Sequence, residues 1–472
     1  MCDGVLIGIV PVLFLDFLVI ALPRSLMPTL LDDAYGGRAY TLLGVAETVR
    51  GILTFLSAPI IGALSDVPYI GRKWLFIVCI IGTATPSLIL AFTPRLDSYL
   101  LALALSGALA STFPLAFAHI ADHVPRSRRA SAFGIATGLG LGGAFTIGPV
   151  LGAAIEGWSG TGQAVFDLCL WLTVANVLIA AVAISDARQP CAPRAATSDS
   201  DDARTADAHS HTCTRQELLR RANPFGALAL VRGNQALWTL SLIVFFYYLS
   251  LWGFIANSLL YCRRRFGLRP PEAAALLSIF GFTNLLAQSV GLRLAQRRLT
   301  EPQITRRCFC CSFLALCVFG VAPQAWMLYP AMVLLGISVG GFACISSMAS
   351  QVVPRAQTGE AQGVVTSLKA LTEGLGPLLT ASALPWFEGS SLPGAPWLLS
   401  ATWVGVSLYL CLRLESAIQG SAVMASRAAG DSKRLDGAEL TPGEEAEASR
   451  LMVGGDVSED GDGDSAGERS PR

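Results

Sequence analysis

The chain has 472 residues, of which 53% are hydrophobic and only 14% are charged, and its mean hydropathy is +0.54. Soluble domains carry about 25% charged residues, and a soluble protein cannot leave many helices apolar on every side. An ordinary soluble protein is therefore excluded, and we predict an all-α integral membrane protein.

Twelve apolar segments follow one another, several of them near the ~20 residues that a helix needs to cross a bilayer. They cover residues 5–28, 41–64, 74–93, 98–119, 131–155, 164–184, 236–259, 271–292, 305–323, 327–350, 362–386 and 396–413. This order predicts a six-helix half over 1–185, a cytoplasmic linker over 186–235 and a second six-helix half over 236–414. The tail over 415–472 has 13 acidic and 6 basic residues, a net charge of −7, and we expect it to be disordered and cytoplasmic.

The first two segments carry charges at the depth of the membrane interior. Asp16 lies about 11 residues into the first helix, ~16 Å deep, and Arg50 lies ~13 Å from the outer end of the second helix. Placing a charged side chain at that depth costs free energy, and such residues usually have a function. We therefore expect an Asp16–Arg50 pair that lines a cavity. Glu47 is one turn from Arg50 on the same helix face, and we place Arg24 near it.

This pair would suit proton coupling, because burial disfavours a charged carboxyl group whereas a nearby guanidinium favours it. A substrate that competes for the arginine, or a conformational change that parts the pair, would change the proton occupancy. A static structural ion pair and direct substrate contact without protons are the alternatives.

A charged hinge follows the second segment, where Gly62 to Asp66 reads GALSD and Gly71-Arg72-Lys73 comes after four further residues. Asp122 ends the fourth segment. Two carboxylates and a guanidinium at one end of the bundle can form a charge-assisted latch. The alternative is that the basic residues only reflect the usual excess of positive charge on the cytoplasmic side.

The fifth and eleventh segments contain glycine–proline pairs that allow close packing or bending. We expect helix hinges at Gly148, Pro149, Gly152, Gly376 and Pro377.

Polar residues in the second half are candidates for the cavity. Asn284 and Gln288 are one turn apart in the eighth segment, where they could bind a substrate or join helices. Lys369 and Glu373 are one turn apart in the eleventh segment, where they could pair locally or present charge to a substrate.

Basic residues gather on one side of the predicted membrane, which indicates that both termini and the linker are cytoplasmic. The short connections on that side hold Arg72, Lys73, Arg126, Arg128, Arg129, Arg293, Arg297, Arg298, Arg306, Arg307 and Arg355. A contrary cluster, Arg263 to Arg265 with Arg269, lies on the other side and has no explanation in the sequence.

The two halves also repeat one another. VPR at Val124–Arg126 recurs at Val353–Arg355, an offset of 229 residues, and Gly62 and Gly134 recur at the same offset as Gly291 and Gly363. Parallel six-helix repeats are typical of the major facilitator architecture.

At these residues the chain resembles the major facilitator superfamily, and within it the hippocampus-abundant-transcript-like and tetracycline-efflux-like branch. The resemblance covers about residues 5–414 and is carried by FLSAPIIGALSD with GRK, AFAHIADHVPRSRRASAFG, GPVLG, ANPFGAL and GLGPLL. It implies that Gly62, Asp66, Gly71, Arg72 and Asp122 form the latch that holds the outward-facing state. Val67 to Ile70 enlarge the hinge relative to the family pattern.

We therefore expect a secondary active transporter of a small organic solute that works by alternating access, with Asp16 as the proton site. No cofactor, metal, nucleic-acid partner or enzymatic activity is expected, and we expect a monomer in the plasma membrane or an internal membrane. A passive uniporter and a non-transporting receptor or scaffold are the alternatives.

Overall fold

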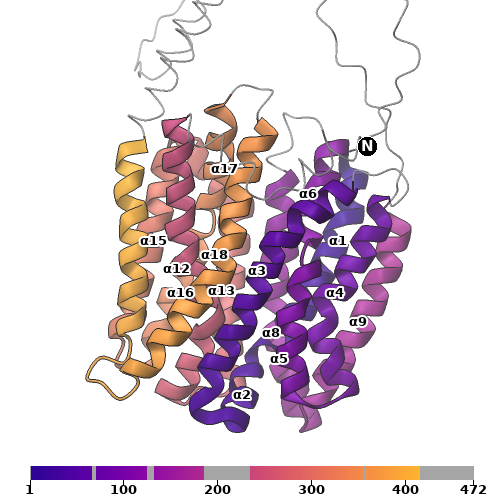
Figure 1. Ribbon diagram of the computed structural model, residues 1–472, viewed down its shortest axis with the longest axis vertical. Helices are drawn as coiled ribbons and strands as arrows, with labels where there is room; N and C mark the ends of the chain where they lie inside the picture. The colour runs from indigo at the N-terminus through magenta and orange to yellow at the C-terminus, as the bar shows by residue number, and fades with distance from the viewer. Residues whose placement is uncertain (1, 66–70, 125–131, 185–233, 354–357, 415–472) are drawn as a thin grey trace, which may run out of the picture. The chain divides into compact units, whose positions relative to one another are not determined.

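The computed structural model describes residues 2–65, 71–124, 132–184, 234–353 and 358–414, and Figure 1 shows its helices. Asp66, the enlargement over 67–70, the predicted linker up to residue 233 and the tail lie outside the described residues.

The regular elements of the described residues are helices. The N-terminal helices are α1 (Cys2–Ala21), η1 (Leu22–Ser25), α2 (Met27–Tyr35), η2 (Gly36–Arg38), α3 (Ala39–Ser65), α4 (Arg72–Phe92), α5 (Leu96–Ser106), η3 (Gly107–Leu109), α6 (Thr112–His123), η4 (Ala136–Gly142), α8 (Gly143–Ser159) and α9 (Gln163–Ala183). The C-terminal helices are α12 (Gln235–Phe266), α13 (Pro270–Leu286), η5 (Ala287–Gly291), α14 (Leu292–Gln296), α15 (Glu301–Val321), η6 (Ala325–Met327), α16 (Leu328–Ser338), α17 (Gly341–Gln351), α18 (Thr358–Phe387) and a last helix over Ala395–Leu414.

Among the described residues, eleven stretches are long and apolar enough to cross a membrane. The remaining long helix, α18, has 30 residues, so it extends ~45 Å at 1.5 Å per residue. It carries Lys369 and Glu373 and packs against α3 and α12. Eleven spans and α18 together confirm the predicted twelve-helix bundle; the exact boundaries of its two halves stay predictions.

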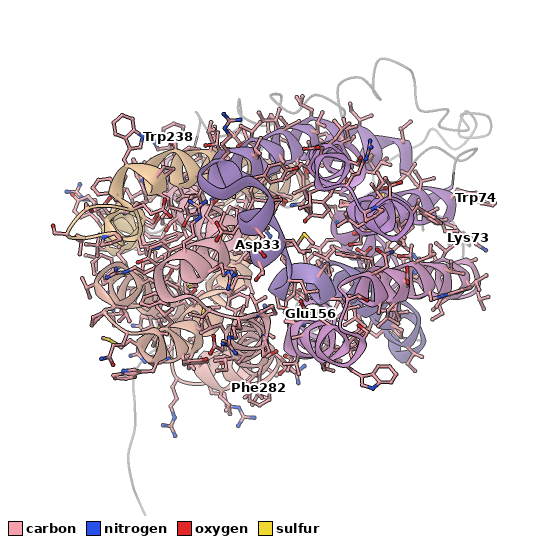
Figure 2. The ribbon with its side chains drawn as sticks, turned by 90° about the horizontal axis from the view of Figure 1, so that it is seen from below. Asp33, Lys73, Trp74, Glu156, Trp238 and Phe282 are labelled. Carbon is pink, nitrogen blue, oxygen red and sulfur yellow. The ribbon has the colours of Figure 1, made fainter. Side chains whose placement is uncertain are left out.

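Large apolar side chains on the outside of the bundle suit a lipid environment. Trp74, Trp238 and Phe282 are more than half exposed, and Figure 2 shows them at its edge, pointing outward. The interior of the C-terminal helices is aromatic, with Trp397 fully buried against Phe254 and Tyr261.

Two helix crossings join the N-terminal and C-terminal helices through glycines. At the α3–α18 crossing, a Cβ added to Gly51 would lie 2.1 Å from the backbone nitrogen of Gly374. At the α8–α13 crossing, a Cβ on Gly281 would lie 2.5 Å from the backbone of Phe145 and Thr146. Only glycine permits such close backbones, so these positions fix the distance between the two groups of helices.

The predicted hinge glycines lie on packing faces. Gly152 of α8 faces the Leu22 carbonyl, and Gly148 faces Ala21 of α1. Gly376 of α18 faces Leu249 and Gly253 of α12. The helices α8 and α18 continue through Pro149 and Pro377, so close packing is observed and the hinge role stays a prediction.

We predict that Gly51→Ala destabilises the protein by about 1–3 kcal/mol or more, because the new methyl group meets backbone atoms that cannot move aside. Thermal unfolding of the purified protein in detergent measures the effect. Gly157→Ala in α8 is the matched control, since no atom lies within 4 Å of its added Cβ. Equal unfolding temperatures for the two variants would contradict the close crossing.

Candidate functional site

Asp16 lies in the middle of the first membrane span, at the eleventh of the 20 residues of Leu6–Ser25. Its side chain is buried, with 3% of the residue exposed. The carboxylate accepts hydrogen bonds from the Thr112 hydroxyl at 2.7 Å and the Thr83 hydroxyl at 2.8 Å. These donors come from α6 and α4, so three helices meet at this carboxyl group.

The predicted Asp16–Arg50 pair is wrong. Arg50 Nη1 instead lies 3.0 Å from Glu47 and 3.3 Å from Glu373 of α18. The reason is the glycine crossing: Gly51 and Gly374 bring α18 against α3, so their neighbours Arg50 and Glu373 meet. Asp16 faces α4 and α6, and no basic side chain among the described residues forms an ion pair with it.

Arg24 extends this cluster, with its guanidinium 3.8 Å from Glu47. We call Arg24, Glu47, Arg50 and Glu373 the four-charge cluster. It contains two cations and two anions, of which Glu373 belongs to the C-terminal helices. The sequence spacing predicted the contact between Glu47 and Arg50 and the position of Arg24.

A small cavity of about 50 Å³ links the four-charge cluster to the neighbourhood of Asp16. The residues that line it include Arg24, Glu47, Arg50 and Thr83. A cavity of this volume with several polar walls can hold water. Because Thr83 also donates to Asp16, polar groups connect Asp16 to Glu47.

A local ion pair, one of the two alternatives for Lys369 and Glu373, is not among the ion pairs of the described residues. The Lys369 ammonium lies over three aromatic rings, 4.7 Å from the centroid of Phe342, 5.0 Å from Tyr248 and 5.8 Å from Phe113. We call these three rings the lysine cage. Glu373 pairs with Arg50 instead, because the α3–α18 crossing brings the two residues together. A guanidinium can bind a carboxylate through two nitrogens, which an ammonium cannot.

Asn284 and Gln288 bond to one another, with the Gln288 amide donating to the Asn284 carbonyl oxygen at 2.7 Å. Both are buried. The Asn284 amide nitrogen has no hydrogen-bond partner within the described residues, so one donor remains available at this point of α13.

Two arginines of the contrary cluster form ion pairs with acids from distant segments. Arg264 binds Asp32 at 2.8 Å and Glu388 at 3.0 Å, and Arg263 lies 3.6 Å from Asp33. Arg264 also donates to the Gly36 carbonyl and stacks over the Tyr40 ring. Figure 2 shows Asp33 between the two groups of helices. The predicted seventh segment extends to Phe266 as α12, and two of its three terminal arginines have acidic partners.

The predicted latch is only partly visible. Gly71 adopts a positive φ of 71° and precedes Arg72, the first residue of α4, which explains the glycine at this turn. Gly62 lies near the end of α3. Asp66 and the side chain of Asp122 lie outside the described residues, so the latch stays a prediction.

Sequence reasoning missed the threonines that hold Asp16 and the assembly of the lysine cage. Thr83 and Thr112 are ordinary hydroxyl residues in apolar segments, and no local pattern connects them to Asp16. The unexplained arginines were a usable signal, since buried or crowded cations require anionic partners. In the described part of the chain, no group of three or more His, Cys, Asp or Glu side chains could hold a metal ion.

Comparison with known proteins assigns the fold to a family. Residues 9–377 match the model of the Major Facilitator Superfamily. The chain belongs to this superfamily. It is 26% identical to human Hippocampus abundant transcript-like protein 1 over 433 residues, which cover 87% of this chain and 81% of that protein. It is also 26% identical to the class C tetracycline resistance protein of Escherichia coli, over 87% of this chain and 96% of that protein.

Solved structures agree on the fold. The human organic anion transporter MFSD10 superimposes with a TM-score of 0.62 at 20% identity, covering 87% of this chain and 99% of its own. A point mutant of the nucleoside transporter NupG gives 0.61 at 15% identity, covering 86% and 99%. Family and fold support membrane transport of a small molecule by a multi-pass protein in the lipid bilayer; the superfamily typically comprises transporters rather than enzymes.

We predict that Arg50→Met lowers the free energy of unfolding by about 3–5 kcal/mol, because it leaves Glu47 and Glu373 buried without their shared cation. Adding Glu373→Gln should recover part of the loss, since one of the two carboxylates is then neutral. Thermal unfolding of the single and double variants measures both effects.

Arg24→Met is the matched control, since Arg24 lies farther from Glu47 and is more exposed than Arg50. A loss from Arg24→Met as large as that from Arg50→Met would contradict the central place of Arg50.

Proposed function

We propose that the protein is a secondary active transporter of a small organic solute, driven by protons and working by alternating access, with Asp16 as the proton-carrying group. The observation that carries this proposal is the environment of Asp16. It is a buried acid at mid-span that is held by two hydroxyl donors and, among the described residues, has no cationic partner.

An ionised carboxylate at this depth is costly without a cation, and two hydroxyl bonds compensate it only partly. A proton at Asp16 removes that cost, and the same hydroxyl groups can then accept a hydrogen bond from the carboxylic acid. The group can therefore be occupied by a proton in one stage of a cycle and empty in another.

The cavity beside Thr83 supplies a route for that proton. Water in this space can contact Glu47 and the Thr83 hydroxyl, and Thr83 contacts Asp16. Protons would exchange through Glu47, water and Thr83, since each of these groups can both accept and donate in some protonation state.

The conformational part of the proposal rests on ion pairs between the N-terminal and C-terminal helices. Arg50–Glu373 joins α3 to α18, and Arg264 with Asp32 joins α12 to α2. Rocking of one group of helices against the other has to stretch or exchange such pairs. We propose that the Arg264 contacts hold the end away from the termini closed and that the latch around Arg72 acts at the cytoplasmic end.

Names of relatives and neighbours bear on the substrate class. They include a tetracycline resistance protein, an organic anion transporter and a nucleoside transporter. These solutes are all small and organic, which supports the same broad class here. The basic residues at the end that holds the termini support cytoplasmic termini.

We predict that Asp16→Asn abolishes accumulation driven by a proton gradient, because an amide cannot release a proton, while solute exchange without a gradient continues. Uptake by the purified protein in liposomes, with an imposed pH gradient and a panel of tetracycline, nucleosides and organic anions, measures this. Asp167→Asn is the matched control, since Asp167 lies exposed on α9 and bonds Gln163.

Wild-type uptake that does not respond to the pH gradient, together with unchanged uptake by Asp16→Asn, would contradict proton coupling and indicate a passive uniporter. If the wild-type protein moves no member of the panel, and a chain that lacks residues 415–472 loses its cellular role, the receptor or scaffold alternative replaces transport.

A further inference from the structure

We propose that Lys369 and the lysine cage form the substrate-binding site, and that this site takes an organic anion with a flat apolar body. The inference rests on the transport function proposed above and specifies its substrate class.

The lysine cage is assembled from four helices. Lys369 stands on α18, Tyr248 on α12, Phe342 on α17 and Phe113 at the start of α6. Phe113 belongs to the N-terminal helices and the other three residues to the C-terminal helices. A solute bound here would touch both groups of helices, which is the contact that alternating access requires.

The lysine cage lies inside the bundle, but three of its four side chains keep some exposed surface. Lys369, Phe113 and Phe342 are each half-buried rather than buried. Rings from three other helices lie around the ammonium. The rings leave the three N–H donors of the ammonium free for an acceptor, because ring faces attract a cation without accepting directional hydrogen bonds as an oxyanion does.

Lys369 and the four-charge cluster together carry one formal positive charge in excess. The four-charge cluster is neutral as a group, since Arg24 and Arg50 balance Glu47 and Glu373. The acid one turn from Lys369, Glu373, is therefore already used by Arg50. An anionic substrate would supply the missing negative charge, whereas a cationic one would meet the ammonium at close range in a site of low dielectric.

The cage also specifies the body of the ligand. Three ring faces around one charge favour a planar apolar group that stacks while its anionic end reaches the ammonium. An aliphatic anion would pair with the Lys369 ammonium but could not stack on the rings.

The same rings connect the site to Asp16. Thr112, which donates to Asp16, is followed directly by Phe113 of the lysine cage. Phe113 also packs edge-on against Phe17, the residue after Asp16, at 5.9 Å between centroids. Ligand that shifts Phe113 therefore moves a neighbour of both Asp16 and its hydroxyl donor, which gives a physical contact between substrate and proton sites.

Binding to the purified full-length protein tests this with three probes that share the naphthalene ring and carry a one-carbon substituent of different charge: 2-naphthoate, 2-naphthylmethanol and 2-naphthylmethylammonium. The dissociation constant should be lowest for the carboxylate, by about tenfold or more over the other two. Lys369→Gln should remove that preference and Lys369→Arg should retain it. Lys73→Gln is the matched control, since Lys73 is the other lysine of the described residues and lies in the first turn of α4, away from the cage.

Phe342→Leu tests the cage. It should weaken 2-naphthoate binding while leaving binding of octanoate, an aliphatic carboxylate, within about twofold. Tyr248→Phe keeps the ring face and should preserve both affinities. Unfolding temperatures measured on each variant identify any loss that comes from misfolding, and the retained preference of Lys369→Arg then separates the charge from the fold.

Equal affinity for the three charge types, absence of naphthoate binding, or a carboxylate preference that survives Lys369→Gln would overturn the site. Liposome uptake separates this failure from failure of the proposed function. Proton-driven uptake of the ammonium or alcohol would keep transport and reject the substrate class. Tight naphthoate binding with no uptake would keep the site and reject transport.

Discussion

The contact between α3 and α18 is the constraint on which the rest of the site depends. Gly51 and Gly374 let the two backbones touch, and this contact places Arg50 against Glu373. Glu373 forms its ion pair with Arg50, and Lys369, one turn away on α18, lies among the rings of its cage. The charge of the proposed substrate site therefore follows from a packing contact between two glycines.

The cost of charge in a membrane interior explains why the acids differ in their surroundings. Glu47 and Glu373 have guanidinium partners within 3.0 and 3.3 Å, so both are held in ion pairs with Arg50. Asp16 has hydroxyl donors only, which leaves a proton as its natural counter-charge. This difference supports Asp16 as the site of proton exchange. The four-charge cluster instead connects α3 to α18.

Much of the fold could be predicted from the sequence, because apolar segments near twenty residues identify membrane helices one by one. The Glu47–Arg50 contact was also predictable, since it depends only on spacing within one helix. The partner of Asp16 was not. Arg50 lies at a matching depth, but side-chain direction depends on which helices touch, and no local pattern relates Thr83 and Thr112 to Asp16 across 67 and 96 residues. The unexplained arginines at the end of α12 show the converse, since their partners Asp32 and Glu388 come from distant segments.

The central claim is that Asp16 gains and loses a proton as the protein works. Infrared difference spectroscopy of the purified protein in lipid tests it most directly, because a protonated carboxyl group has a C=O band of its own. The account predicts a band that falls as the pH rises, changes when ligand binds and is missing from Asp16→Asn. A difference spectrum that is the same in the wild-type protein and in Asp16→Asn would contradict it.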